Sequence, residues 1–267
     1  MNVLATRAQI DAANAYEALF VPSLFGPWAP KVADAVDLAP GQRVLDVACG
    51  TGILAREAAS RIGSDGSLAG VDPNEGMLEV ARKLSPKIQW RQGVAESLPF
   101  PDRSFDAVVS QFGLMFFSDR SRALREMIRV LVPGGRLAVA VWDTLESIPA
   151  YAAMVALLDR AAGREAADAL RAPFVLGDPA GLAALFEDAG VTGVEIVTPR
   201  GIARFPSVRA MVGADLRGWL PVMGVNLSEE RIAHILGEAE QLLAPYVTED
   251  GAAVFGTSAH IVTGARA

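Results

Sequence analysis

An apolar run enters a turn with two glycines at Val44-Leu45-Asp46-Val47-Ala48-Cys49-Gly50-Thr51-Gly52. A helical pattern begins directly after Gly52, so the stretch predicts a strand, a tight turn and a helix. Glycine admits left-handed backbone torsions and leaves room for a ligand beside the chain. Asp72 ends the next apolar run, where a carboxylate can accept hydrogen bonds from a ribose diol. The turn and the acid together predict a nucleotide-type site at the carboxyl ends of parallel strands.

Two alternatives stay open for this stretch. Tight packing of the strand against the helix would also explain Gly50 and Gly52, and NAD-binding folds share the same plan. Cys49 is expected to be a small buried residue rather than a nucleophile, because no histidine lies near it in the sequence.

The rest of the chain alternates short apolar runs with helical patterns, which is typical of a parallel sheet with crossover helices. We predict a Rossmann-like α/β fold, a seven-stranded, mostly parallel sheet with helices on both faces, and a helical cap inserted between strands 6 and 7. The predicted strands are residues 43–47, 67–71, 88–91, 105–110, 136–142, 194–198 and 252–263. The predicted helices include residues 74–84, 119–130, 149–162, 179–189 and 228–243, with Asn74 and Ser228 as N-caps.

Composition limits the class of protein. The chain has 267 residues, 51% of them hydrophobic, and no apolar run approaches the roughly 18 residues of a membrane span. Residues 1–17 lack the basic and then apolar order of a signal peptide, and the single cysteine excludes an internal disulfide. We therefore expect a cytoplasmic protein without a membrane span and without a bound metal.

Charge argues against a nucleic-acid partner. The net charge is −7, whereas nucleic-acid binding needs dense Lys and Arg to displace counterions from phosphates. Arg120, Arg122, Arg125 and Arg129 fall on the polar side of the predicted helix 119–130, so we expect a solvated face there. A homodimer remains open as the oligomeric state.

Several further stretches occur in a familiar order. They are Gly70-Val71-Asp72-Pro73-Asn74-Glu75-Gly76-Met77-Leu78, Gly93-Val94-Ala95-Glu96-Ser97-Leu98-Pro99-Phe100, Ser104–Ser110 and Leu131–Leu137. With the glycine turn, they resemble the motifs of class I methyltransferases that depend on S-adenosylmethionine (SAM). The closest likeness is to the branch that contains ubiquinone and menaquinone biosynthesis methyltransferases, and it covers residues 40–142.

The resemblance implies SAM as cofactor, S-adenosylhomocysteine as product, and a role for each matching position. Asp46 would lie near the amino group of the methionine part, Asp72 would hold the ribose, and Met77 would pack on the adenine. Val94 stands where the family often has an acidic residue, so the contact to the adenine amino group would be lost or taken over by Glu96. The full set of implied cofactor residues is Tyr16, Asp46, Ala48, Cys49, Gly50, Asp72, Pro73, Met77, Val94, Ala95, Glu96 and Gln111.

The resemblance also divides the chain. Residues 1–40 would form a helical segment over the cofactor site, residues 41–205 and 247–267 the SAM-binding domain, and residues 206–246 a helical cap or substrate lid. Apolar side chains near the mouth of the sheet favour a small apolar or aromatic acceptor. The residues expected to bind it are Phe25, Trp28, Phe112, Met115, Phe116, Trp219 and Met223.

No catalytic residue is assigned from the sequence. A methyl group on sulfonium is already activated, so the enzyme would work mainly by positioning the acceptor for in-line displacement. His234 and His260 are the only histidines, and both are expected to be structural or solvated. Two other functions remain open, an NAD-dependent oxidoreductase on a similar fold and a non-catalytic SAM-binding or scaffold protein.

Overall fold

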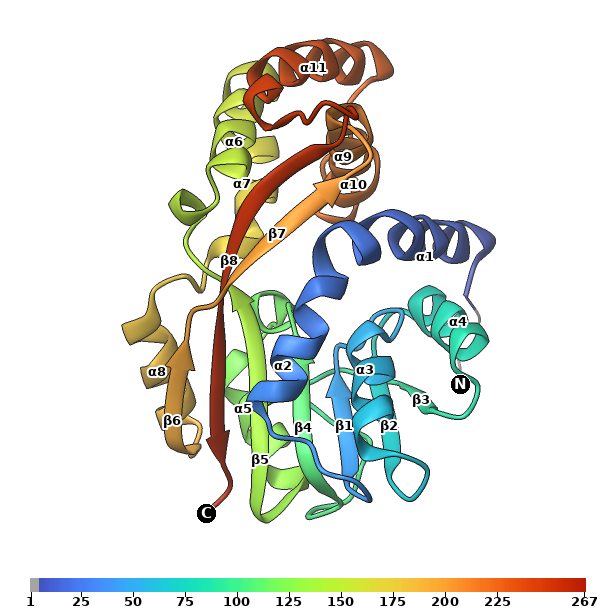
Figure 1. The fold of residues 1–267 in the computed structure, drawn as a ribbon, viewed down its shortest axis with the longest axis vertical. Coiled ribbons are helices and arrows are strands. Elements are labelled where there is room, and N and C mark those ends of the chain that lie inside the picture. The colour runs from blue at the N-terminus through green and yellow to red at the C-terminus, as the bar shows by residue number, and fades with distance from the viewer. Residues whose placement is uncertain (1–4) are drawn as a thin grey trace.

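The protein is described by a computed structural model over residues 5–267, and it has two layers along its longest axis (Figure 1). An α/β sheet forms the lower layer, and helices stand over the carboxyl ends of its parallel strands. The sheet order is β3-β2-β1-β4-β5-β8-β6, with β1 to β5 parallel and β8 antiparallel to both neighbours. The strands are β1 (Arg43–Val47), β2 (Ser67–Asp72), β3 (Gln89–Gln92), β4 (Phe105–Gln111), β5 (Leu131–Trp142), β6 (Thr192–Val197), β7 (Arg200–Phe205) and β8 (Ala253–Ala265).

The Rossmann-like class is as predicted, but the number of strands is not. The described chain has eight strands, because β7 pairs antiparallel with the first part of β8, from Arg200 opposite Ser258 to Phe205 opposite Ala253. The predicted cap therefore lies between β7 and β8 rather than between a sixth and a seventh strand. Gly201 and Ala203 have weak strand propensity, so β7 was hidden in the sequence.

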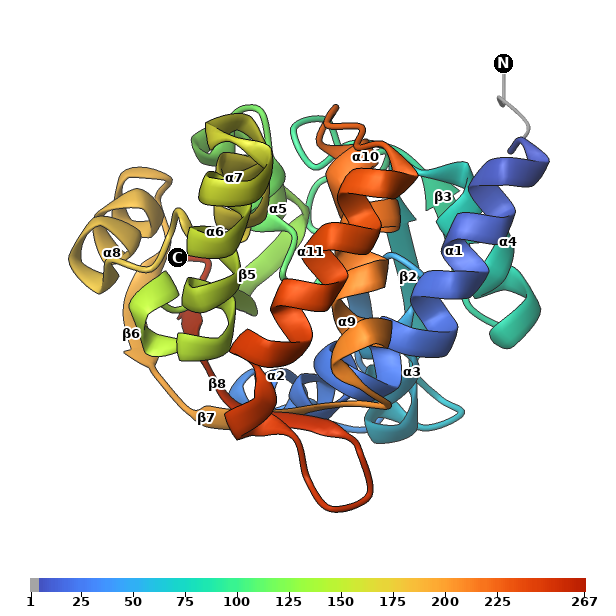
Figure 2. The same ribbon diagram turned by 90° about the horizontal axis from the view of Figure 1, so that it is seen from above.

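Helices cover both faces of the sheet (Figure 2). Helices α2 (Ala29–Ala35), α3 (Ile53–Ile62) and α4 (Glu75–Leu84) lie on one face, and α5 (Arg120–Val130) lies on the other, with α8 (Pro179–Asp188) beside α5. Asn74 Oδ1 accepts hydrogen bonds from Gly76 N at 2.9 Å and Met77 N at 3.3 Å, which is the predicted N-cap of α4.

A second group of helices stands over the carboxyl edge of the sheet (Figure 1). They are α6 (Pro149–Ala162), α7 (Arg164–Arg171), α9 (Val208–Ala214), the π-helical turn η6 (Asp215–Trp219), α10 (Leu220–Val222) and α11 (Glu229–Leu242). Helix α11 packs against both α6 and α9, so residues 149–171 join residues 206–246 in one helical layer, which we call the cap. Ser228 Oγ accepts a hydrogen bond from Arg231 N at 3.2 Å, as expected for the N-cap of α11. Helix α7 was not predicted.

The N-terminal segment lies beside this cap. Helix α1 (Arg7–Phe20) begins with a capping box, in which Thr6 N donates to Gln9 Oε1 at 2.8 Å. It packs on α4 at Gly76, where a Cβ would lie 2.6 Å from the carbonyl oxygen of Gln9. Residues 1–4 of the predicted segment 1–40 lie outside the described residues. The chain then turns through η1 (Val21–Phe25) and η2 (Gly26–Trp28).

Four short 3-10 turns complete the described elements, namely η3 (Leu114–Phe116), η4 (Leu145–Ser147), η5 (Ala172–Phe174) and η7 (Ala244–Tyr246). Within residues 5–267 no single helix is long and apolar enough to cross a membrane. One bent pair of helices, Arg164–Phe174 with Pro179–Asp188, reaches that length and apolar composition only when the two are taken together.

Candidate active site

Strained backbone marks the carboxyl ends of β1 and β4. Ala48 has φ +58° and Phe112 has φ +56°, in the left-handed region that costs a non-glycine residue roughly 1–2 kcal/mol. The two turns touch, because a Cβ on Gly113 would lie 2.6 Å from the Cβ of Ala48. Strain of this kind gathers at ligand sites, where the surrounding structure holds it in place.

The two glycines of the first turn have different surroundings. Gly50 has φ +53°, and nothing lies within 4 Å of the position that a Cβ would take. Gly52 has φ +90°, and a Cβ there would lie 2.5 Å from Cη2 of Trp90. Tight packing therefore accounts for Gly52, whereas the backbone of Gly50 is open to a ligand.

Asp72 links the end of β2 to this turn. Its Oδ2 accepts a hydrogen bond from Gly50 N at 2.9 Å, and its Oδ1 accepts one from Asn74 N at 2.8 Å. Burial raises the pKa of Asp72 to about 6, and the two backbone N–H groups act in the opposite direction. Each carboxylate oxygen has a second lone pair, so Asp72 can still accept hydrogen bonds from a ligand.

Asp46 is more deeply buried, with 1% of its surface exposed. Its Oδ2 has no hydrogen-bond partner, and burial raises the pKa of Asp46 well above its ordinary value. Burial, and then the charges of Asp72, Glu17 and Asp46, raise the pKa of the Tyr16 phenol on α1. Cys49 is buried and its thiol pKa is raised, so a thiolate nucleophile is not favoured.

An ion pair fastens α1 to the helix that follows the glycine turn. Glu17 Oε1 accepts a hydrogen bond from Arg56 Nη2 at 2.8 Å, and Arg56 Nη1 donates to the carbonyl oxygen of Thr51 at 2.7 Å. The other carboxylate oxygen of Glu17, Oε2, is buried without a partner. This ion pair holds α1 against the glycine turn, although only one of the two carboxylate oxygens of Glu17 has a hydrogen-bond partner.

Unpartnered polar atoms collect at this edge of the sheet. In the described part of the chain they are Glu17 Oε2, Asp46 Oδ2, Thr51 Oγ1, Ser110 Oγ and Gln111 Oε1. The amide of Gln111 is oriented by its Nε2, which donates to the carbonyl oxygen of Phe25 at 3.0 Å. A buried polar atom without a partner costs about 1–3 kcal/mol, so the set is incomplete without a ligand. Most of these atoms are acceptors beside three acids and one arginine, which suits a ligand that donates hydrogen bonds and carries positive charge.

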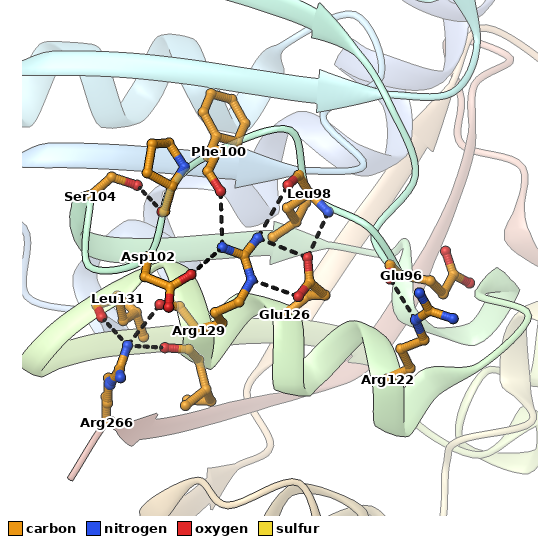
Figure 3. A network of polar contacts seen from close by, with 12 residues as sticks. Glu96, Leu98, Phe100, Asp102, Ser104, Arg122, Glu126, Arg129, Leu131 and Arg266 are labelled. Atoms are coloured by element: carbon orange, nitrogen blue, oxygen red, sulfur yellow. Dashed lines mark hydrogen bonds and ion pairs between the residues drawn. The ribbon is translucent and has the colours of Figure 1, made fainter.

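Helix α5 holds the loop that follows β3 (Figure 3). Arg122 Nε donates to the carbonyl oxygen of Glu96 at 2.8 Å. Arg129 Nη1 donates to the carbonyl oxygen of Phe100 at 2.9 Å and to Asp102 Oδ1 at 2.7 Å, and Glu126 pairs with its other nitrogens. The loop from Val94 to Phe100 is therefore held through its backbone carbonyls by side chains of α5, in addition to the burial of its own Leu98 and Phe100 in the core.

The expectation of a fully solvated arginine face on α5 is therefore wrong for two of its members. Arg120 and Arg129 are half-buried, and Arg120 Nη2 donates to the carbonyl oxygen of Met115 at 2.9 Å. Arg122 and Arg125 are exposed as expected. The arginine side chain has five N–H donors in a fixed planar arrangement, and backbone carbonyl oxygens of the neighbouring loops accept hydrogen bonds from them.

The residues expected around the adenine lie in several environments. Met77 is half-buried on α4, Ala95 is buried, and Val94 is 45% exposed. Glu96 Oε1 already accepts a hydrogen bond from Ser118 N at 2.8 Å. Pro73 is exposed directly after Asp72.

Four of the residues expected to bind the acceptor lie in two aromatic clusters at this edge, Phe25 with Phe112 and Phe116 with Trp219. Phe25 stacks on Tyr16 with 5.4 Å between ring centroids and lies 5.7 Å from Phe112. Phe112 stacks on Trp142 at 3.9 Å, with ring planes 10° apart. Phe116 and Trp219, one from the loop after β4 and one from the cap, lie 5.1 Å apart.

Three other expected residues lie apart from this group or inside the core. Trp28 is fully buried under Gly201, where a Cβ would come within 2.7 Å of its ring, although it also meets Phe112 edge-on at 5.9 Å. Met115 is buried. Met223 is 37% exposed and lines a surface pocket of about 500 Å³ on α7, which none of the other expected acceptor residues lines.

The two histidines have structural surroundings. His260 is buried, with Nδ1 at 2.8 Å from Thr198 Oγ1 and Nε2 at 3.0 Å from the carbonyl oxygen of Gly177. His234 lies on the outside of α11 and pairs with Glu238 at 2.7 Å.

Known proteins are similar to the part of the chain that contains the glycine turn, Asp72 and Gln111. A family model described as a methyltransferase domain matches residues 45–139. Residues 45–139 are therefore similar to a methyltransferase domain. The resemblance predicted from the motifs is confirmed for this part of the chain.

Relatives of the methyltransferase domain include quinone-modifying enzymes. A demethylmenaquinone methyltransferase of Renibacterium salmoninarum is 47% identical over 113 residues, which cover 42% of this chain and 46% of the relative. A 2-phytyl-1,4-naphtoquinone methyltransferase of Thermosynechococcus vestitus is 41% identical over 115 residues, 42% of this chain and 51% of the relative. The chain thus spans about half the length of the curated relatives it matches.

Solved structures extend the likeness of fold beyond the methyltransferase domain. Phosphoethanolamine N-methyltransferase 2 of Haemonchus contortus, in complex with phosphomonomethylethanolamine and S-adenosylhomocysteine, matches with a TM-score of 0.61 and 18% identity. The match covers 98% of this chain and 58% of that one. At this identity the likeness concerns the fold, and it confirms the Rossmann-like α/β class.

Sequence reasoning missed Glu17, Arg56 and Trp142, and also Asp215 and Tyr151 in the cap. Glu17 and Arg56 are 39 residues apart, so no local pattern connects them. The signal available for Asp215 was an acid next to the apolar positions Met211, Val212 and Leu216.

Proposed function

We propose that the protein binds SAM at the carboxyl edge of its sheet and transfers the methyl group to a small apolar or aromatic acceptor. One observation carries the proposal. Buried, unpartnered acceptor atoms surround the open backbone of Gly50, and the acids Glu17, Asp46 and Asp72 outnumber Arg56 there. SAM carries a sulfonium and an ammonium against one carboxylate, so it supplies the positive charge and the donors that this edge lacks.

Each residue around the turn has a proposed part in holding the cofactor. Asp72 would accept hydrogen bonds from the ribose hydroxyls, and Asp46 with Gln111 would take donors of the methionine part, beside the open backbone of Gly50. Met77 and the Val94–Phe100 loop would enclose the adenine. Bound SAM supplies a methyl group that is already activated, so the task of the chain is to orient the acceptor and exclude water.

The same charges argue against NAD. A dinucleotide brings a doubly anionic pyrophosphate, which normally binds backbone N–H groups at a helix N-terminus. Here Asp72 Oδ2 already takes the N–H of Gly50, and the buried carboxyls would repel a pyrophosphate at that turn. An oxidoreductase is therefore the weaker reading.

The acceptor is proposed from the side chains at the mouth of the sheet and from the relatives. Phe25, Phe112, Trp142 and Trp219 offer ring faces for an aromatic or quinone-type molecule. The relatives named above act on naphthoquinone-type acceptors, which have this chemistry. Residues 5–40 and the cap would close over the two ligands.

Calorimetric titration with SAM, S-adenosylhomocysteine and NAD tests the cofactor. We expect micromolar binding of the two adenosyl ligands and none of NAD. Asp72→Asn should weaken SAM binding by roughly tenfold to a hundredfold, because charged hydrogen bonds are worth about 1.5–3 kcal/mol each. Asp65→Asn, at an exposed position before β2, serves as the control. Binding of NAD alone, or an unchanged Asp72→Asn, would contradict the proposal.

Turnover separates an enzyme from a SAM-binding scaffold. With SAM and a panel of phenols, quinols and amines, an enzyme releases S-adenosylhomocysteine at a rate that depends on the acceptor. SAM binding without acceptor-dependent release would instead favour the scaffold.

A further inference from the structure

A second buried acid lies in the cap, away from the glycine turn. Asp215 opens the π-helical turn η6 and is 4% exposed, and its Oδ2 has no hydrogen-bond partner. Burial is the one cause that raises the pKa of Asp215 to about 8. A carboxyl group in this state costs stability unless something pairs with it.

The rest of the cap does not supply that partner. Arg217, two residues on, pairs with Glu229 at 2.7 Å on the outside of the cap. Burial, and then the charge of Asp215, raise the pKa of Tyr151 on α6. No hydrogen bond joins Asp215 to Tyr151 in the described part of the chain. Asp215 therefore has no structural role that its contacts explain.

One route of ring contacts leads from Asp215 to the loop after β4 through its own element. Trp219 follows four residues later in η6, and its Nε1 donates to the carbonyl oxygen of Ala169 at 2.8 Å. The ring of Trp219 lies 5.1 Å from that of Phe116 in η3. Since η3 follows Gln111 and Phe112, this contact joins η6 to the edge where the cofactor would bind.

A second route runs through Tyr151. Its ring lies 5.8 Å from Phe174, which lies 6.5 Å from Trp142. Trp142 stacks on Phe112. Both routes end at the carboxyl end of β4, so a series of mostly buried aromatic rings connects the part of the cap that carries Asp215 to this edge of the sheet.

We propose that Asp215 recognises the acceptor, with Oδ2 accepting a hydrogen bond from a hydroxyl group on an aromatic ring and taking its proton during methylation. This inference rests on the proposed function. The O–H bond breaks, its proton goes to Oδ2, and its electron pair stays on the acceptor as an aryloxide able to attack the methyl carbon. The aryloxide oxygen forms a new O–C bond to the methyl carbon while the C–S bond breaks with its electrons on sulfur, and water removes the proton from Asp215 when the product leaves.

The charge state of Asp215 agrees with this role. A base works best when its pKa lies near the working pH, and a carboxyl with a pKa of about 8 gains and loses its proton near neutrality. Ring faces of Tyr151 and Trp142 would hold the apolar part of the acceptor, while the carboxyl selects the ring that carries a donor.

A matched pair of probes tests the selection. 1-Naphthol and 1-methoxynaphthalene differ in whether the oxygen carries a hydrogen, and each is titrated calorimetrically into the full chain saturated with SAM. We expect the wild type to prefer 1-naphthol by several-fold to about tenfold, which is what one hydrogen bond to a buried carboxyl group provides. Asp215→Leu should abolish the preference, Asp215→Asn should reduce it, and Asp188→Leu on the exposed side of α8 should keep it.

Thermal melting of the same variants distinguishes a recognition residue from a structural one. Asp215→Leu should melt at the wild-type temperature or higher, because it removes a buried polar atom without a partner. A lower melting temperature for both Asp215 variants, equal preference in wild type and Asp215→Leu, or binding of neither probe would overturn the inference. If SAM itself fails to bind in the control titration, the proposed function fails instead.

Discussion

Two alanine substitutions in the glycine turn form a matched pair. Gly50 and Gly52 both have positive φ, so alanine costs each site about 1–2 kcal/mol of folding free energy. Gly50→Ala should lose no further folding free energy, because nothing lies within 4 Å of the new methyl group. At Gly52 the methyl group would lie 2.5 Å from Trp90, and overpacking of this kind adds about 1–3 kcal/mol. We expect Gly50→Ala to lose about 1–2 kcal/mol and Gly52→Ala about 2–5 kcal/mol.

For SAM binding we expect the opposite order, with the larger loss in Gly50→Ala and the smaller loss in Gly52→Ala. The methyl group of Gly50→Ala fills the space that a ligand would need beside the backbone. The affinity for SAM should therefore fall at least tenfold, which corresponds to about 1.4 kcal/mol. The methyl group of Gly52→Ala points at Trp90, so the folded fraction of that variant should bind with an affinity closer to the wild type.

Urea unfolding followed by tryptophan fluorescence measures the first effect, and calorimetric titration with SAM measures the second. Wild-type affinity in Gly50→Ala would refute the argument that the turn faces the cofactor. Equal stability of the two variants would refute the packing argument at Trp90.

Three other perturbations test separate contacts. Arg56→Met removes the ion pair to Glu17, so amide hydrogen exchange in α1 should speed up and SAM binding should weaken. Arg61→Met on the same helix is the control, and equal effects of the two substitutions would contradict a role for the Glu17–Arg56 ion pair. Arg129→Met should lower the free energy of unfolding by about 2 kcal/mol and speed exchange in residues 94–103, whereas unchanged exchange there would show that the loop is held otherwise. Burial raises the pKa of Asp215 from 3.8 to about 8, so the folded state holds this proton more tightly than the unfolded chain, and the stability that the neutral carboxyl provides is present below pH 3.8 and lost as the pH rises to about 8. Asp215→Asn should accordingly gain stability relative to the wild type over that interval in urea titrations, and a difference independent of pH would be inconsistent with the burial of this acid.

The cofactor half of the molecule was predictable because its signals are local. The turn at Gly50, the acid at Asp72 and the N-cap at Asn74 each lie within one short stretch of sequence. Strands in a parallel sheet are buried on both faces, so β1, β2 and β4 read as apolar runs.

Strand β7 and helix α1 were less predictable because their contacts join distant segments. Strand β7 alternates exposed Ile202 and Arg204 with buried Ala203 and Phe205, a pattern too short to distinguish from a loop. The pairing of Glu17 with Arg56 depends on how α1 crosses the sheet. No local rule makes these contacts, and they appear only once the tertiary structure is known.

The pairing of β7 with β8 has a consequence for protein engineering. Phe205 and Ala253 are opposite each other in the two strands, so residues 206–252 leave the sheet and return to it about 5 Å apart. An insertion whose ends are adjacent can be exchanged with little strain on its host. A foreign insertion joined at these two residues would need a face that fits α6, α7 and Phe116, and under the proposed function it would give the same sheet a new choice of acceptor.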